Sequence, residues 1–285
     1  MEESKVIKKE QADFALDIFL DPYNGRVRID NYRGNIEKII EASETIAREN
    51  NAEKLIIKSR MEQFAKFIEY GYRLEGRIEG YFLGSDCLFF SKFYSQNRKE
   101  SNHWLKEDGI LNSVHRLERK PKWVNPPAQY TLKKIVENDA DRLASLYQAV
   151  FQIYPTPLNN PDYIKKTMKE GTIYYGFECN GEIVSAASAE VNYFYKNAEL
   201  TDCATLLEHR KYGLMKVVLN RLEKELKEKG IYCSYSIARS LSFGMNAALH
   251  QLGYRYCGRL INNCYIYDKL ENMNIWVRDL SLSGN

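Results

Sequence analysis

The stretch CATLLEHRKYGLMKVVLNRLEKELKEKG, residues 203–230, passes from an apolar run through a short cationic bend into a long amphipathic segment. After Tyr212 the apolar residues recur at helical spacing, which predicts a helix with one buried face. A strand that enters a helix through a glycine-containing bend leaves several backbone N–H groups unpaired, and the helix dipole adds partial positive charge there. The bend therefore predicts an anion site beside Arg210, Lys211 and Gly213. An ordinary loop with basic residues at the surface is the alternative.

The segments around this stretch alternate between strand and helix signals. Asn180-Gly181 favours a tight hairpin between two of the strands. Strands are predicted over residues 130–136, 172–179, 182–194, 198–206, 231–238, 254–261 and 274–280. Helices are predicted over residues 137–151, after Pro161, after Tyr212 and over residues 243–251. This order predicts an α+β fold with a mixed sheet over residues 129–285.

The first 95 residues repeat part of this order. Residues 71–78 read GYRLEGRI and residues 253–260 read GYRYCGRL, and each copy follows a strand, a short helix and, further back, a long helix. The counterpart of the cationic bend, Arg33-Gly34, has no glycine three residues after the arginine. We therefore expect residues 1–95 to be a truncated, degenerate copy with a structural role, in an extended sheet or a pseudo-dimer. A helical, Pro-rich linker is expected over residues 96–128.

Composition excludes several function classes. The chain has 41 Lys and Arg against 38 Asp and Glu, a net charge of +3, so bulk charge favours neither nucleic acid nor an anionic membrane as partner. The amino terminus is charged and no apolar run approaches the ~18 residues needed to cross a bilayer, which predicts a cytoplasmic protein. The 6 cysteines stand singly without metal-site spacing and are interpreted as reduced packing residues.

The element order and the Arg210-x-x-Gly213 bend resemble the GNAT acyltransferase superfamily, whose corresponding bend holds the pyrophosphate of acetyl-CoA. The chain departs from that motif at its last position, Met215. A closer resemblance is to the β-lysine N-acetyltransferases, and the N-terminal half is similar to that family's extra domain. The blocks that carry it, between Val150 and Leu280, read VFQIYPTPLNNPDYIKKTM, NAELTDCATL, SIARSLSFGMN, GYRYCGRLINN and ENMNIWVRDL.

This resemblance implies the GNAT acyl-CoA N-acyltransferase fold, acetyl-CoA as cosubstrate, a small-molecule amine as acceptor and no metal. It also implies a pathway link to lysine 2,3-aminomutase, which makes β-lysine, and leaves a homodimer possible. Ser242 stands where related enzymes often have an asparagine near the cofactor, and Asn246, one turn on, could replace it. The residues expected to contact acetyl-CoA are Cys203, Ala204, Thr205, Arg210, Lys211, Tyr212, Gly213, Leu214, Met215, Ser242 and Asn246.

Acetyl transfer requires the free amine, yet a lysine-like ε-amine titrates near ~10.4, so a base must take its proton. Glu199 occupies a place similar to the strand-borne glutamate that serves as base in some of these enzymes, and Asp202 and Glu190 are its rivals. Alternation along a strand predicts that Glu199 and Asp202 point to opposite faces. A main-chain N–H near Ala204 or Thr205 is expected to bind the developing oxyanion.

The proton donor for the leaving thiolate is not identified by the resemblance. The tyrosine that often has this role is replaced by Leu249. Tyr254, His250 and Tyr235 are the candidates that remain, and His250 is expected on the surface of its helix. Solvent is the other source.

A β-lysine acceptor carries two ammonium groups and a carboxylate, so its pocket should contain acids and a cationic donor. Arg239 is the candidate for the carboxylate. Glu190, Asn262, Asn263 and Asn274 are the candidates for the remaining lining, with turn-forming roles as the alternative for the asparagines. Two other functions stay open: acetylation of another small amine, such as a polyamine, lysine or an aminoglycoside, and non-catalytic acyl-CoA binding.

Overall fold

A computed structural model describes residues 4–119, 125–151, 156–266 and 269–282. Residues 120–124 of the expected linker and residues 152–155 of the block that begins at Val150 lie outside the described residues. The strands are β1 (Lys5–Glu10), β2 (Phe14–Asp21), β3 (Arg26–Gly34), β4 (Lys54–Ser59), β5 (Arg73–Phe82), β6 (Ser85–Phe93), β7 (Thr131–Ile135), β8 (Ile173–Cys179), β9 (Glu182–Asn192), β10 (Asn197–Thr205), β11 (Cys233–Arg239), β12 (Arg255–Ile266) and β13 (Lys269–Asp279).

The helices alternate with these strands. The α-helices are α1 (Ile36–Glu49), α2 (Phe64–Glu69), α3 (Gln96–Lys99), α4 (Trp104–His115), α5 (Ala140–Val150), α6 (Pro161–Lys169), α7 (Leu214–Glu228) and α8 (Phe243–Gln251). Three short 3₁₀ helices are η1 (Met61–Gln63), η2 (Glu137–Asp139) and η3 (Leu207–Tyr212). The expected order of elements after residue 129 is confirmed, although β12 and β13 are longer than the sequence indicated.

The strands form one 13-stranded mixed sheet in the order β1-β2-β3-β4-β6-β5-β12-β13-β11-β10-β9-β8-β7. Among the described strands two neighbouring pairs are parallel, β3 with β4 and β10 with β11. The two ends of the sheet have the same plan, since β1-β2-β3∥β4-β6-β5 and β8-β9-β10∥β11-β13-β12 follow the chain in the same way. The C-terminal half adds β7, α5 and α6. The division at residues 95 and 129 stays a prediction, because strands from both sides of it share the sheet.

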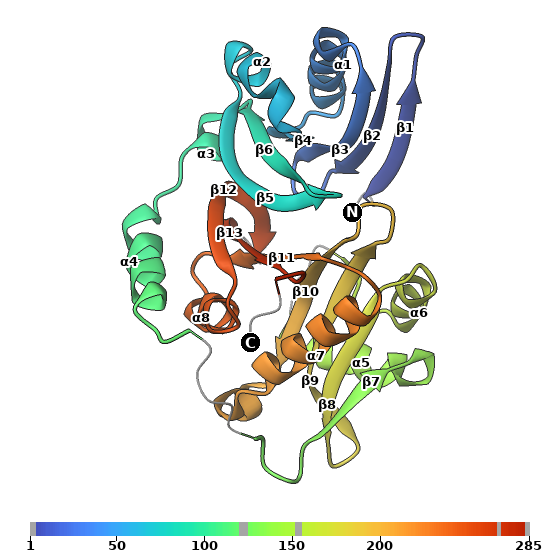
Figure 1. Ribbon diagram of the computed structural model, residues 1–285, viewed down its shortest axis with the longest axis vertical. Coiled ribbons are helices and arrows are strands. Elements are labelled where there is room, and N and C mark those ends of the chain that lie inside the picture. The colour runs from blue at the N-terminus through green and yellow to red at the C-terminus, as the bar shows by residue number, and fades with distance from the viewer. Residues whose placement is uncertain (1–3, 120–124, 152–155, 267–268, 283–285) are drawn as a thin grey trace.

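The two halves meet where β5 runs antiparallel to β12 (Figure 1). Gly76 pairs with Gly258, and these are the sixth residues of the two copies of the repeated motif. A β-carbon on Gly258 would lie 2.4 Å from both the Glu75 carbonyl oxygen and the Gly76 Cα, and Gly258 has φ of +139°. Only glycine allows the two strands to approach this closely.

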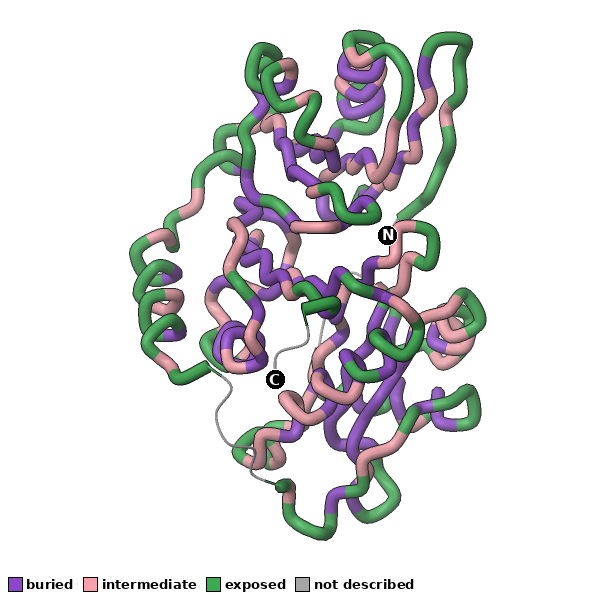
Figure 2. Tube along the Cα trace, in the orientation of Figure 1, coloured by how far each residue is buried: buried purple, intermediate pink, exposed green. Residues whose placement is uncertain are grey.

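Helices cover the sheet unevenly, and buried residues concentrate in the strands and on the inner sides of the helices (Figure 2). α1 and α2 pack on the N-terminal half, α7 and α8 on one face of the C-terminal half, and α5 and α6 on its other face. One apolar cluster contains strand residues alone, with Ile56 and Phe89 from the first half packed with Tyr235 and Leu260 from the second. The two halves of the sheet therefore cover each other across this cluster.

Candidate active site

β10 and β11 run as neighbours only over Asn197–Glu199 and Cys233–Tyr235, and then they separate. Among the described strands, β10 then pairs only with β9 and β11 only with β13. The free edge of β10 exposes main-chain groups, and the Leu200 carbonyl accepts a hydrogen bond from the Ser236 hydroxyl at 2.8 Å instead of a strand partner. An extended ligand can use such an edge in the way that an added strand would.

A bulge interrupts β10 beside this separation. Asp202 and Cys203 together stand opposite one residue of β9, and Asp202 has φ of +51°. The Ser188 hydroxyl donates to the Asp202 carboxylate at 2.7 Å, and Ser188 shares a face of the sheet with Glu190. Glu190 lies directly opposite Glu199, so Glu199 and Asp202 reach the same face. The prediction of opposite faces is wrong, because the extra residue of a bulge breaks the alternation of side chains.

The predicted anion site lies between η3 and α7. Gly213 has φ of +66°, and a β-carbon there would meet only Lys216 Cε, at 3.7 Å, so the space beside it is open. No side chain caps the start of α7, which leaves its first N–H groups for an anion. Arg210 and Lys211 are exposed, and Arg210 Nε donates to the Thr205 carbonyl oxygen at 3.1 Å. The arrangement therefore fits a phosphate-bearing ligand.

Most of the other residues expected at the cofactor have side chains that pack or form hydrogen bonds inside the protein. Those packed in or against the core are Cys203, Ala204, Tyr212, Leu214 and Met215. Thr205 shares a hydrogen bond of 2.8 Å with the Ser185 hydroxyl. Burial raises the pKa of the Cys203 thiol, which keeps it protonated. These positions can meet a ligand mainly through their main chain.

Asn246 belongs to an internal network at the start of α8. Its amide nitrogen donates to the Arg239 and Ser242 carbonyl oxygens at 2.9 and 2.7 Å. Its amide oxygen accepts from Asn274 at 2.9 Å and from the Trp276 indole at 2.8 Å. Because these four bonds satisfy the amide, Asn246 has no hydrogen-bonding capacity left for a cofactor.

Glu190 and Glu199 form a pair of facing carboxylates. Burial is the largest cause that raises the pKa of Glu199, followed by the charge of Glu190, and the pKa reaches about 7 although Lys58, Arg28 and the Tyr235 hydroxyl lower it. Burial also raises the pKa of Glu190, while Arg28 and Lys58 lower it. With its pKa of about 7, Glu199 gains and loses a proton near neutral pH. Such a pair can accept a proton from an amine.

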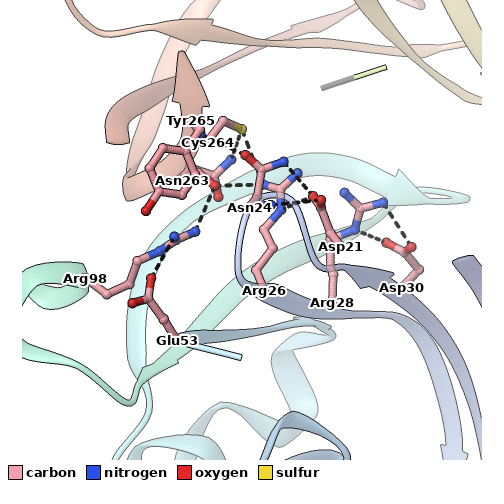
Figure 3. Close-up of polar contacts among 10 residues, drawn as sticks. All are labelled: Asp21, Asn24, Arg26, Arg28, Asp30, Glu53, Arg98, Asn263, Cys264 and Tyr265. Carbon is pink, nitrogen blue, oxygen red and sulfur yellow. Dashed lines mark hydrogen bonds and ion pairs between the residues drawn. The ribbon is translucent and has the colours of Figure 1, made fainter. Parts of the chain in front are cut away.

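The cations in this site come from the N-terminal half, for which the sequence predicts only a structural role. On β3, Arg28 binds Asp30 through two hydrogen bonds, of 2.6 and 3.0 Å (Figure 3). On β4, Lys58 Nζ lies 2.8 Å from the Asp30 carboxylate and 3.2 Å from the Tyr81 hydroxyl. The alternation of charged and apolar residues in Arg26-Val-Arg-Ile-Asp30 was the sequence signal for a charged strand face. It did not reveal that the charged face meets the other half of the sheet.

Arg239 and Asn274 are engaged with protein groups. Arg239 forms a bidentate pair with Glu271, with distances of 2.8 and 2.7 Å. The Asn274 amide oxygen accepts from the Ser240 hydroxyl at 2.9 Å and from Arg259 Nε at 3.0 Å. The structure therefore gives Arg239 a carboxylate partner within the chain.

Asn262 and Asn263 join the two halves of the sheet. The Asn262 amide nitrogen donates to the carbonyl oxygens of Asn97, Arg98 and Glu100 at 2.9, 3.2 and 2.6 Å. The Asn263 carbonyl oxygen accepts from Arg26 at 3.1 Å and from Arg98 at 3.2 Å (Figure 3). These contacts hold the β12–β13 hairpin against residues of the first half and of α3.

The candidate proton donors are all buried. The Tyr254 hydroxyl is 2.6 Å from the Ser234 hydroxyl. His250 Nε2 lies 3.1 Å from the Leu117 carbonyl oxygen, and the residue is buried against α4, so the expectation of a surface histidine is wrong. Tyr235 stands opposite Glu199 in the register of β10 and β11. Burial raises the pKa of Tyr235 well above its usual value, which makes it a hydrogen-bond donor and a weak acid.

Comparison with known proteins shows that this chain is similar to acetyltransferases. The Acetyltransferase (GNAT) family matches residues 140–254. The N-acetyltransferase YodP of Bacillus subtilis is 39% identical over 260 residues, which cover 91% of this chain and 94% of that protein. The beta-lysine N(6)-acetyltransferase of Methanosarcina mazei is 37% identical, covering 88% of this chain and 100% of that protein. The enzyme of the same name from Methanococcus maripaludis is 35% identical, covering 92% and 95%.

Solved structures resemble about half of the chain. An N-acetyltransferase from Staphylococcus aureus Mu50 has 16% identity and a TM-score of 0.47, covering 54% of this chain and 99% of that one. The protein YncA from Salmonella typhimurium, solved with acetyl-CoA, has 15% identity and a TM-score of 0.47, covering 55% of this chain and 98% of that one. In the part of this chain that the structure describes, no helix is long and apolar enough to cross a membrane.

Proposed function

Because this chain belongs to the GNAT family of acetyltransferases, we propose that it transfers the acetyl group of acetyl-CoA to the terminal amine of β-lysine. The products are Nε-acetyl-β-lysine and free coenzyme A. Two relatives over most of the chain carry the name beta-lysine N(6)-acetyltransferase, which supports this acceptor. A cytoplasmic location, and a lysine 2,3-aminomutase that supplies β-lysine, belong to the same proposal.

The separated β10–β11 edge and the start of α7 fit acetyl-CoA. The open space beside Gly213 and the uncapped first turn of α7 suit its diphosphate, and the exposed Arg210 and Lys211 add positive charge. The bulged main chain at Asp202 and Cys203 offers N–H donors for an oxygen that gains negative charge. The cosubstrate supplies an acyl group activated as a thioester.

The position and the pKa of Glu199 are the observations that carry the proposal. Glu199 lies at the last paired position before β10 and β11 separate, beside a second acid, and its pKa of about 7 lies near neutral pH. At that value Glu199 is ionised often enough to accept a proton and basic enough to attract one. In this mechanism Glu199 takes the proton of the acceptor ammonium, Glu190 attracts the positively charged acceptor, and Asp202 is held by Ser188 at 2.7 Å. After the attack the amide nitrogen loses its second proton and the departing thiolate gains one, and solvent mediates both transfers.

The test incubates the purified protein with acetyl-CoA and a panel of amines, and quantifies products by mass spectrometry. The panel contains β-lysine, lysine, a polyamine and an aminoglycoside. We expect the highest kcat/KM with β-lysine and acetylation of its terminal amine. Binding of acetyl-CoA without acetylation of any amine would refute the enzymatic function, and a higher kcat/KM with a polyamine would refute the acceptor.

Glu199→Gln tests the base separately from the acceptor. The amide keeps the shape of the side chain but cannot take a proton, so kcat should fall by about 100-fold or more while acetyl-CoA still binds. Glu182→Gln is the matched control, since Glu182 lies exposed at the start of β9, and its rate should be unchanged. A Glu199→Gln protein with the wild-type rate would remove Glu199 from the mechanism.

A further inference from the structure

The Arg28–Asp30–Lys58 network is a rigid, positively charged group on the helix-free face of the first half. Asp30 bonds both cations, and the Arg28 guanidinium also lies over the Phe19 ring, 4.8 Å from its centroid. Burial would raise the pKa of Asp30, but Arg28 and Lys58 outweigh it and hold the pKa well below its usual range. Asp30 is therefore an anion, and with two cations the network keeps one positive charge.

This network faces the acids of the second half. The Tyr81 hydroxyl, which bonds Lys58, belongs to a ring whose centroid lies 5.7 Å from that of Tyr235, and Tyr235 stands opposite Glu199 in the register of β10 and β11. Arg28 and Lys58 accordingly lower the pKa of both Glu190 and Glu199. Glu190 is desolvated by the protein around it and yet its side chain is exposed to water. Similarly, Arg28 is strongly desolvated while 27% of its side-chain surface stays accessible. Water therefore reaches Arg28 of one half and Glu190 of the other, and the water-accessible space beside them is called the recess.

Arg28 retains hydrogen-bonding capacity toward this recess. Its Nε and Nη2 bind Asp30, whereas its Nη1 has no hydrogen bond to any residue that the structure describes. Lys58 is occupied by Asp30 and Tyr81. Arg239, the cation expected from the sequence to bind a carboxylate, is paired with Glu271. Arg28 is thus the cation of the site that can form a new charge-assisted bond.

We propose that Arg28 binds the carboxylate of the acceptor, so that the N-terminal half supplies the specificity residue of the catalytic half. This inference rests on the proposed function and deepens it. An amino acid with a second, remote amine spans the recess: its carboxylate meets Arg28, and its ammonium groups meet Glu190 and Glu199. Asp30 is a positioning residue that fixes the guanidinium. A diamine without a carboxylate leaves Arg28 Nη1 without a partner and is disfavoured, because that N–H group then loses water without gaining a hydrogen bond.

The test compares two acceptors that differ only in the carboxylate, β-lysine and 1,4-diaminopentane, with wild-type protein and Arg28→Gln. We expect the ratio of their kcat/KM values to fall by about 10- to 100-fold in Arg28→Gln, the range for one charge-assisted hydrogen bond. The loss should come mainly from KM for β-lysine. The ratio is independent of the fraction of folded protein and of any change in the basicity of Glu199, since both affect the two acceptors equally.

Two further variants separate recognition from folding. Arg28→Lys keeps the charge and should restore part of the preference for β-lysine. Arg33→Gln is the matched control, because Arg33 lies exposed on the same strand with Glu10 as its ion-pair partner, and its ratio should equal that of the wild type. An unchanged ratio in Arg28→Gln, or an equal loss with both acceptors, would overturn the proposal.

A failure of the proposed function gives a different result. If the wild-type protein acetylates no amine, the function is refuted, and calorimetric binding of β-lysine to wild-type and Arg28→Gln protein decides the inference by itself. Equal affinities in that measurement would overturn it, and a weakening of about 10-fold or more would support it. If the wild-type protein acetylates only amines without a carboxylate, both proposals are wrong.

Discussion

The Glu190–Glu199 pair makes the pH dependence of the reaction a sharp test of the site. Glu199 must be ionised to accept a proton, so kcat/KM should fall as the pH drops through its pKa of about 7. Glu190→Gln removes a negative charge that disfavours ionisation of Glu199, so the acid limb should move below pH 7. Lys58→Met removes a positive charge that favours ionisation, so the limb should move above pH 7. Two variants of one site thus shift the same limb in opposite directions.

The size of the first shift follows from the register of the strands. Glu190 and Glu199 are directly opposite on antiparallel neighbours, which places their side chains about 5 Å apart. Two unit charges at that distance interact by about 1 to 3 kcal/mol for an effective dielectric constant between about 80 and 20. Since about 1.4 kcal/mol corresponds to one pH unit, the limb of Glu190→Gln should move down by about 0.5 to 2 pH units. The upward shift in Lys58→Met should be smaller, because Lys58 is shared with Asp30.

The assay measures kcat/KM for β-lysine between about pH 5 and 9 with acetyl-CoA in excess, and quantifies acetylated product by mass spectrometry, which avoids pH-dependent thiol reagents. Glu182→Gln serves as the control and should keep the wild-type limb. The position of the limb tests Glu199 as the base, whereas the height of the plateau falls in Glu190→Gln if Glu190 also binds the acceptor. A limb that stays at the same pH in Glu190→Gln, or that moves in the same direction in both variants, would refute the assignment of Glu199 as the titrating base.

Three other perturbations test separate parts of the structure. Gly258→Ala should lower the free energy of unfolding by about 3 kcal/mol or more, because the added β-carbon would overlap the main chain of β5. Denaturant titration measures this loss, and Gly244→Ala, which has open space around it, should be neutral or stabilising. Asn246→Ala should lower the free energy of unfolding by about 2 to 4 kcal/mol, because it leaves buried partners without a hydrogen bond. Thermal melts should show this loss, while KM for acetyl-CoA stays the same. Arg210→Gln and Lys211→Gln should each raise KM for acetyl-CoA by about 3- to 10-fold with kcat unchanged, and added salt should reduce the difference.

The strand, the bend and the helix around Gly213 could be predicted from the sequence because their signals are local. Helical spacing of apolar residues, a glycine at the bend and exposed cations beside it determine that part of the site within about 20 residues. The bulge at Asp202 was not predictable in the same way. It arises from the pairing of β10 with β9, and a one-residue irregularity in a ladder leaves no signature in a single strand.

The partners of the asparagines and of Arg239 could not be predicted from the sequence either. Their residue types suit a polar pocket as well as a buried network, and only the partners decide between the two. Asn246, Asn262 and Asn274 meet main-chain groups or one another, and Arg239 meets Glu271 more than 30 positions later in the chain. Partners so distant in sequence come together only through the sheet, so composition and spacing carry no information about them.

The facing halves of the sheet give the N-terminal charges a physical explanation. Arg28 and Glu199 are each the third residue of a nine-residue strand, and each pairs with the third residue of the parallel strand beside it, Ile56 or Tyr235. We propose that they are equivalent positions of a duplicated fold. Since the two halves cover each other, identical residues at such positions would place like charges on opposite walls of one recess, which is costly where water is partly excluded. A cation on one copy and an acid on the other remove that cost, so the first half can lose its own catalytic residues and still complete the site of the second.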